Sequence, residues 1–156
     1  MSTNHTVAER STQFTSFVIE RTFSAPVARV YNAFADEEAK SRWFSGPDAW
    51  KEAGREFNFV VGGREYLKGV WNDGTVSEFT CMYNDIVPRQ RIVYTYAMNV
   101  NDKRISVSLA TLEFTPDGER THMKMTEQAV YLDGYPTPED RITGTEALFD
   151  RLEASL

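Results

Sequence analysis

Apolar and polar residues alternate along most of the chain, and this period is typical of strands with one buried face. Segment 14–23 places Phe17, Ile19 and Phe23 on one face, which Arg21 shares. Six later segments carry strand signals and are separated by turn signals such as GG, NDG and PDG. They read EFNFVV, EYLKGVW, TVSEFTCMYNDIV, RIVYTYAM, RISVSLATLEF and THMKMTEQAVY. The pattern therefore predicts an antiparallel meander of six strands in addition to the first.

The period changes to that of a helix directly after the first strand. The apolar positions at helical spacing are Val27, Val30, Tyr31 and Phe34. We expect Ser24 to cap this helix and Pro26 to lie in its first turn. Asp36 is the expected cap of a second short helix that carries Trp43 and Phe44. Together these signals predict two short helices in a V.

The last segment, 137–156, predicts the longest helix. Thr137 is a good N-cap residue and Pro138 suits the first helical position. The apolar stripe consists of Ile142, Thr145, Phe149, Leu152 and Leu156, with Leu148 beside it. Gly144 costs such a helix about 1 kcal/mol, which indicates a close backbone contact at this position.

The turn of the last hairpin allows two registers. If Asp117-Gly118 form a two-residue turn, Ser108 lies opposite Glu127. If Pro116-Asp117 form a type I turn with Gly118 as a bulge, Val107 takes that place. The first register keeps an apolar face continuous and is preferred.

Length and charge narrow the class of protein. A chain of 156 residues is of single-domain size, and its net charge of −6 argues against binding nucleic acid. A single cysteine, Cys81, excludes an internal disulfide and is expected to be a small buried residue. No apolar run approaches the length of a membrane span. Residues 1–12 lack a signal peptide and predict a flexible segment before a domain at 13–156, in the cytoplasm.

Several segments resemble a known family. They are IERTFSAPVARVYNAFADEEAKSRWFSGP, VGGREYLKG, RIVYTYAM, TLEFTPDGERTHMKMTEQAVYLDGY and RITGTEALFDRLEASL. They are similar to bacterial single-domain members of the AHSA-type family, named after the activator of the heat-shock protein 90 ATPase, in the START-like (SRPBCC) superfamily. The resemblance spans about Phe14 to Leu156.

The resemblance implies an α+β helix-grip fold. In this fold a curved antiparallel sheet of about seven strands surrounds the long C-terminal helix, and two short helices follow the first strand. Members leave a cavity between sheet and helix, closed at one end by the short helices, and use it for lipids, hormones or polyketides. The eukaryotic activators work chiefly through an additional N-terminal domain, whereas about a dozen residues precede the first strand here. A chaperone partner is therefore a secondary expectation.

Glu127 lies on the same strand face as Met123 and Met125. A buried carboxylate must be paired, protonated or in contact with a wet space. Three interpretations stay open: a polar group facing a ligand, a structural pair with an arginine or hydroxyl, or a bulge that turns Glu127 outward. For Arg21 we expect a buried pair with a carboxylate on the early helices.

The candidate cavity residues combine this carboxylate with the aromatic side chains of the strands and helices. They are Trp43, Phe44, Tyr66, Trp71, Tyr94, Tyr96, Met123, Met125, Glu127 and Phe149. The sequence does not decide which face of the strands containing Glu78, Glu113, Tyr94 and Tyr96 lines the cavity.

The favoured function is binding of a small, largely hydrophobic molecule in this cavity. One alternative is an enzyme in which Glu127 is the general base and Tyr94 or Tyr96 the hydrogen-bond donor, for hydration or cyclisation chemistry. Another is a chaperone accessory or protein-interaction module, and a homodimer is possible. With only His5 and His122, no metal site or catalytic triad is expected, and no cofactor.

Overall fold

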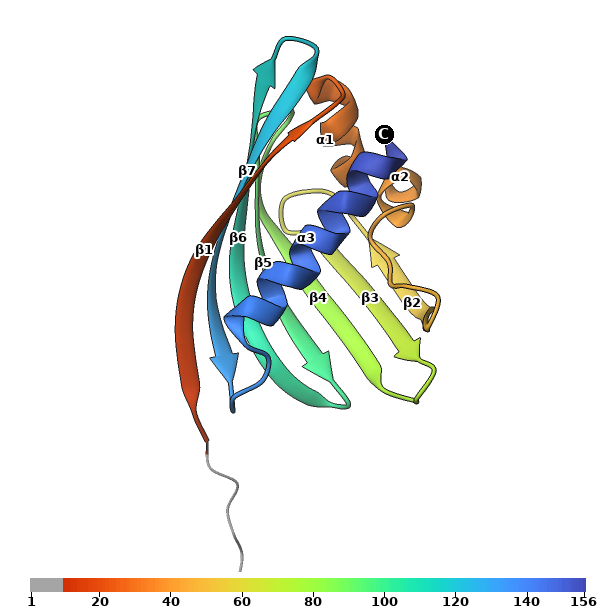
Figure 1. Cartoon of the computed structure of the whole chain (residues 1–156), viewed down its shortest axis with the longest axis vertical. Coiled ribbons are helices and arrows are strands. Elements are labelled where there is room, and N and C mark those ends of the chain that lie inside the picture. Colours follow the sequence, from red (N-terminus) through yellow and green to blue (C-terminus); the bar gives the residue numbers. More distant parts are fainter. Residues whose placement is uncertain (1–9) are drawn as a thin grey trace, which may run out of the picture.

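Seven antiparallel strands form one sheet in the order β1-β7-β6-β5-β4-β3-β2. The computed structural model describes residues 10–156, so residues 1–9 of the expected flexible segment lie outside the described residues. The elements are β1 Thr12–Phe23, α1 Val27–Ala35, α2 Glu37–Ser41, β2 Trp50–Phe57, β3 Arg64–Trp71, β4 Val76–Val87, β5 Arg91–Val100, β6 Lys103–Asp117, β7 Arg120–Leu132 and α3 Pro138–Ser155. The predicted α+β helix-grip fold is confirmed (Figure 1).

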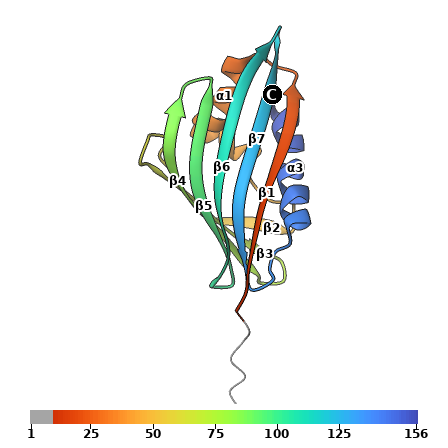
Figure 2. The same cartoon turned by 90° about the vertical axis from the view of Figure 1, so that its left-hand side faces the viewer.

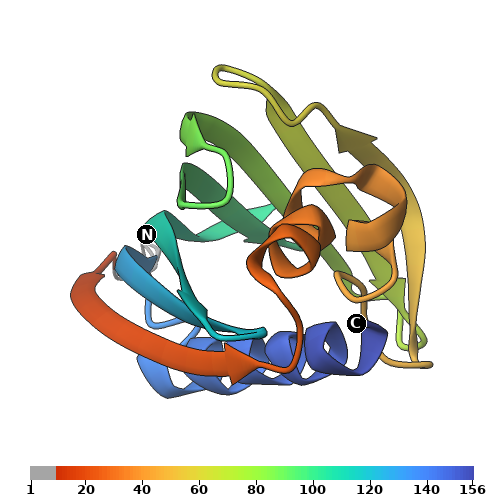
Figure 3. The same ribbon diagram turned by 90° about the horizontal axis from the view of Figure 1, so that it is seen from above.

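The sheet is curved, and α3 crosses its concave side (Figures 1 and 2). Seen from above, α1 and α2 lie at one end of the space between sheet and helix (Figure 3). Alternate residues of each strand point to this concave side and are buried, for example Met123, Met125 and Tyr131 on β7. From α3, the side chains of Phe149 and Leu152 are buried in the same core.

The hairpin of β6 and β7 has neither of the two predicted registers. Asp117 pairs with Arg120, so the turn residues are Gly118 and Glu119, and Ala110 lies opposite Glu127. Gly118 has φ +63°, as the first central residue of a type II′ turn requires. The pairing differs from the preferred register by two residues. Because the side-chain period of a strand is two, Glu127 keeps its predicted face.

The helix ends follow the predicted caps in two of three cases. Asp36 accepts a hydrogen bond from the Ala39 N–H at 3.0 Å. Thr137 and Asp140 form a reciprocal capping box at the start of α3. Ser24 does not cap α1, because Pro26 occupies the N-cap position without a side-chain hydrogen bond.

Three other predictions need correction. The second short helix, α2, ends at Ser41, so Trp43 and Phe44 lie in the turn that follows it and not on the helix. The predicted strand EFNFVV ends at Phe57, and β2 instead extends back to Trp50. Arg21 does not pair with the early helices. Its guanidinium binds Asp150 of α3 at 2.7 Å and donates to the Glu146 carbonyl at 3.0 Å, because β1 lies beside α3.

Candidate functional site

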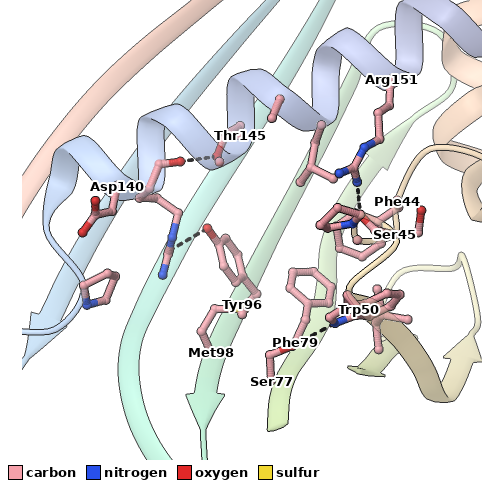
Figure 4. A pocket seen from close by; sticks show the side chains of 18 of the residues that line it. Phe44, Ser45, Trp50, Ser77, Phe79, Tyr96, Met98, Asp140, Thr145 and Arg151 are labelled. Atoms are coloured by element: carbon pink, nitrogen blue, oxygen red, sulfur yellow. Dashed lines mark hydrogen bonds between the residues drawn. The ribbon is translucent and has the colours of Figure 1, made fainter. Parts of the chain in front are cut away.

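A cavity of about 670 Å³ lies between the concave face of the sheet and α3. Strands β3 to β7 form one wall, α3 forms another, and the segment 43–50 closes one side. Most of its lining is apolar or aromatic, and all three tryptophans of the chain, Trp43, Trp50 and Trp71, belong to it. Figure 4 shows Phe44, Phe79 and Trp50 grouped toward one end and Asp140 at the other.

Seven of the ten predicted site residues line this cavity: Trp43, Phe44, Trp71, Tyr94, Tyr96, Met125 and Phe149. The other three do not. Met123 is fully buried in the core and Glu127 is fully buried beside the cavity. Tyr66 lies on the convex face, where its hydroxyl donates to Glu78, and this hydrogen bond raises the pKa of Tyr66 to about 12. Tyr66 and Trp71 are five residues apart, so one regular strand cannot place both on the same face.

The four side chains whose facing the sequence left open divide evenly between the two faces. Tyr94 and Tyr96 point to the cavity. Glu78 shares the convex face with Tyr66, its hydrogen-bond partner. Glu113 is exposed and lies opposite Lys124 of β7.

Glu127 is the centre of a buried polar cluster. Its carboxylate accepts hydrogen bonds from the Tyr96 hydroxyl at 2.8 and 2.9 Å, from Ser108 at 3.2 Å and from Arg141 at 3.4 Å. Arg141 also donates to Ser106 at 2.6 Å. Burial raises the pKa of the Glu127 carboxyl, and the guanidinium and hydroxyl partners oppose this rise. The geometry is that of the structural pair, one of the three interpretations left open by the sequence.

Arg141 was not among the predicted site residues. It comes from the first turns of α3 and lines the cavity beside Tyr96. A signal for it was present, because Arg141 precedes Thr145 by four residues and so continues the apolar stripe of the helix toward its N-terminus.

A second buried ion pair joins α2 to the sheet. The Lys40 ammonium binds Glu65 Oε1 at 2.6 Å, and the Tyr83 hydroxyl donates to the same oxygen. The ammonium also lies 4.7 Å from the centre of the Phe44 ring and 5.8 Å from that of Phe57, which suits a cation–π contact. The second oxygen of Glu65, Oε2, is buried and has no hydrogen-bond partner within residues 10–156.

The sequence also contained a signal for Glu65. It shares a strand face with Leu67 and Trp71, as Glu127 does with Met125. The parity argument that identified Glu127 would have identified Glu65 as well.

Three phenol rings connect the two polar clusters. The ring centres of Tyr83 and Tyr94 are 6.0 Å apart, and those of Tyr94 and Tyr96 are 5.9 Å apart. Among residues 10–156, the Tyr94 hydroxyl makes no hydrogen bond. Burial raises the pKa of Tyr94 well above its ordinary value, so its phenol stays neutral and can donate.

Trp50 fills space that a glycine leaves open. Its indole N–H donates to Ser77 at 3.2 Å (Figure 4), and a Cβ added to Gly69 would lie 1.8 Å from the indole nitrogen. A glycine inside a strand often marks such a close approach. Gly69 was therefore the signal for this contact, which the sequence analysis missed.

The segment 43–50, which closes one side of the cavity, accepts hydrogen bonds from α3 and β2. Arg151 of α3 donates to the Ser45 carbonyl (Figure 4), and Arg55 of β2 donates to the Phe44 carbonyl at 3.0 Å. The predicted close contact of Gly144 is wrong, because a Cβ added there meets no atom within 4 Å. Gly144 lines the cavity and leaves that part of it open.

Other kinds of site find little support in residues 10–156. No group of three or more His, Cys, Asp or Glu side chains could hold a metal ion there. Cys81 is buried as predicted, and burial raises the pKa of its thiol to about 12. None of the described helices is both long and apolar enough to cross a membrane.

A curved sheet that grips a terminal helix defines the START-like helix-grip class, whose members are ligand-binding or accessory domains. Within this class, the chain belongs to the family described as Activator of Hsp90 ATPase homolog 1-like protein, whose sequence model matches residues 24–156. No curated protein matches the chain.

Solved structures agree with this assignment. The chain is similar to a protein of Rhizobium leguminosarum described as uncharacterized, with 39% identity, a TM-score of 0.89 and coverage of 94% of this chain and 97% of the other. It is also similar to the Mll3558 protein of Rhizobium loti, with 37% identity, a TM-score of 0.86 and coverage of 94% and 99%. An AHSA1-like protein of Aeromonas hydrophila, 20% identical with a TM-score of 0.70 and coverage of 90% and 91%, shares the fold.

Proposed function

We propose that the chain binds a small, largely apolar molecule in the cavity between the sheet and α3. The observation that carries this proposal is the size of the cavity, about 670 Å³, together with its aromatic lining. Pockets for small ligands typically enclose about 300–1,000 Å³ and are lined by apolar groups with a few polar ones. Burial of apolar ligand surface contributes about 25 cal/mol per Å² before the costs of association are subtracted.

The polar groups that orient the ligand in this proposal are Tyr94, Tyr96 and Arg141, which line the cavity. Glu127 was the polar contact expected from the sequence, but it is fully buried and does not line the cavity. Its role in the proposal is to hold Tyr96 and Arg141 from behind.

The three tryptophans in the cavity wall provide the test. We expect the neutral apolar dye N-phenyl-1-naphthylamine to change their fluorescence in a saturable way and to bind at one site per chain. Mass spectrometry of the protein, first native and then denatured, tests whether a small molecule is carried through purification. A linear, unsaturable response to the dye together with no released molecule would overturn the proposal.

Proton-transfer catalysis by Glu127 is not favoured as a second function. The carboxylate has no exposed surface, and its partners Tyr96 and Arg141 are the groups that line the cavity. A general base must come within hydrogen-bond reach of the proton that it abstracts.

A homodimer, a chaperone partner and a cytoplasmic location stay predictions. Sedimentation velocity of the full chain tests the first. The ATPase rate of an Hsp90 chaperone with and without the chain tests the second, and cell fractionation tests the third.

A further inference from the structure

In the two buried ion pairs of the cavity wall, the cation faces the cavity and the carboxylate does not. Lys40 and Arg141 line the cavity, whereas Glu65 and Glu127, the carboxylates that they pair with, have no exposed surface and do not line it. A molecule inside the cavity therefore meets the donor side of each ion pair. The carboxylates that do line the cavity, Asp73 and Asp140, are exposed to solvent, which screens their charge.

Arg141 has hydrogen-bonding capacity left over. Its Nη1 atom donates toward Tyr96, Ser108 and Glu127, and Nη2 donates to Ser106. A guanidinium carries five N–H donors, of which two are on each Nη and one on Nε. Among the described residues, the Nε–H and the second N–H of Nη2 therefore have no acceptor.

A second unpaired donor lies close to this guanidinium. Among the described residues, the Tyr131 hydroxyl is buried without a hydrogen-bond partner, and the Arg141 Cζ atom is 5.4 Å from the centre of the Tyr131 ring, although Tyr131 itself does not line the cavity. Tyr94 lines the cavity, and its hydroxyl makes no hydrogen bond to any described residue. The unused donors that line the cavity are therefore those of Arg141 and Tyr94, and an acceptor that reaches them there gains more than it would in water.

We propose, building on the function proposed above, that the ligand is an amphiphile whose head group is a hydrogen-bond acceptor, specifically a carboxylate, and that Arg141 receives this head. Planar guanidinium groups match the geometry of a carboxylate. The tail then lies among the rings that line the cavity along α3, toward Phe44 and Phe79. Glu127 competes for the same guanidinium. Since burial raises the pKa of Glu127, it can take up a proton when the ligand carboxylate arrives.

Three probes with the same alkyl tail test the head-group preference: dodecanoate, dodecanol and dodecylammonium. Titration calorimetry on the full chain, below the micelle concentration of each probe, gives the three dissociation constants. We expect dodecanoate to bind at least about tenfold more tightly than dodecanol, because one charge-assisted hydrogen bond has about that value. Dodecylammonium should bind most weakly.

The outcomes separate the two proposals. If none of the three probes binds and N-phenyl-1-naphthylamine does not bind either, the proposed function itself fails. If the dye binds but none of the three probes does, only the carboxylate inference is overturned. If dodecanol and dodecanoate bind equally, or if dodecylammonium binds best, the cavity binds apolar molecules but the carboxylate inference is overturned.

Two variants locate the preference at Arg141. Glu127→Gln keeps an oxygen that can accept from Tyr96 and Arg141 but removes the competing charge, so it should bind dodecanoate more tightly than the wild type does. The double variant Glu127→Gln/Arg141→Gln removes both charges together, so no buried charge is left unpaired. It should lose the roughly tenfold preference for dodecanoate over dodecanol. Thermal unfolding of both variants checks that each is folded at the temperature of the titration.

Retention of the preference in the double variant would overturn the assignment to Arg141. Loss of dodecanoate binding in Glu127→Gln alone would also overturn it, because the carboxylate rather than the guanidinium would then be the group that the ligand needs.

Discussion

Glu127 shows how a carboxylate is accommodated inside an apolar layer. It accepts hydrogen bonds from two hydroxyls and one guanidinium, contributed by β5, β6 and α3. These partners offset part of the cost of taking the charge out of water, and burial still dominates, so the pKa of Glu127 is raised. The ionised carboxylate is thus held at a cost in stability.

The pH dependence of stability follows from this raised pKa. The folded state holds the Glu127 proton more tightly than the unfolded chain, whose carboxyl titrates near 4.5. Raising the pH from 4.5 through the folded pKa therefore favours the unfolded state. We expect the free energy of unfolding of the wild type, relative to Glu127→Gln, to fall across this window.

Urea unfolding of both proteins between pH 4.5 and about 8 measures this difference. Glu113→Gln, on the exposed face of β6, is the matched control for the loss of one carboxylate. A difference between wild type and Glu127→Gln that rises with pH would contradict the assignment.

The Lys40–Glu65 pair should be sensitive to the loss of one partner. Lys40→Met leaves Glu65 as a buried carboxylate with only the Tyr83 hydroxyl, and removing one member of a buried pair typically costs about 3–5 kcal/mol. The double variant Lys40→Met/Glu65→Gln should recover a large part of this loss. Equilibrium urea unfolding of the single and double variants tests both statements, and equal stability of the two would show that the charges do not interact.

At the residue scale, strand parity predicted which carboxylate turns inward but not what it meets. Glu127 was identified because it shares a face with Met125, and Glu65 could have been identified in the same way. The partners Arg141 and Lys40 lie on helices, and no local pattern states which strand a helical side chain will reach. For a site formed between a sheet and a helix, the sequence therefore predicts the inward-facing strand residue but not its partner on the helix.

At the element scale, the hairpin of β6 and β7 shows that alternation of apolar and polar residues determines which face a side chain takes, whereas the turn determines which residues pair. The faces predicted from alternation are correct, although the observed pairing differs from the preferred register by two residues. The register depended on which residues turn, and the choice of Gly118 as the first central residue requires its φ of +63°. Neither of the two predicted turns formed, because nothing in PDGE shows that Gly118 is the first central residue rather than the second or a bulge.

Helix α3 is defined by its cap and weakened by Gly144. A Cβ at this position meets nothing within 4 Å, so Gly144→Ala adds helix propensity without a clash. We expect the variant to raise the free energy of unfolding by up to about 1 kcal/mol, measured by urea unfolding. A loss of stability would instead support the close backbone contact that the sequence had suggested.

At the scale of the whole molecule, the cavity exists because α3 lies across the sheet without its side chains filling the space beneath it. Hydrogen bonds near both ends of α3 hold this arrangement. Arg141 donates to Ser106 of the sheet, and Arg151 donates to the Ser45 carbonyl. Closely packed interiors are the rule, so a space of about 670 Å³ forgoes contacts that a solid core would make. A ligand that binds only the folded state restores such contacts and raises the melting temperature with its concentration.

Filling the cavity without disturbing its walls tests this view directly. Gly144 lines the cavity at a solvent-exposed position and has open space at its Cβ, so Gly144→Phe should place a ring across this edge of the cavity while Gly144→Ala leaves it nearly open. We expect Gly144→Phe to weaken binding of N-phenyl-1-naphthylamine at least about tenfold, because the ring takes up space and apolar wall surface that the dye would use. Gly144→Ala should bind the dye as the wild type does.

Thermal unfolding of Gly144→Phe shows whether a loss of dye binding comes from the ring blocking the cavity or from destabilisation of the fold. If the introduced ring packs against the cavity wall, Gly144→Phe should melt no lower than the wild type, since it buries apolar surface in space that was empty. Equal dye affinity in the two variants would place the dye elsewhere on the molecule and remove the support for a ligand site beneath α3. A folded protein with lost affinity, beside an alanine variant with normal affinity, would instead tie binding to this space, because the two chains differ only in the side chain that occupies it.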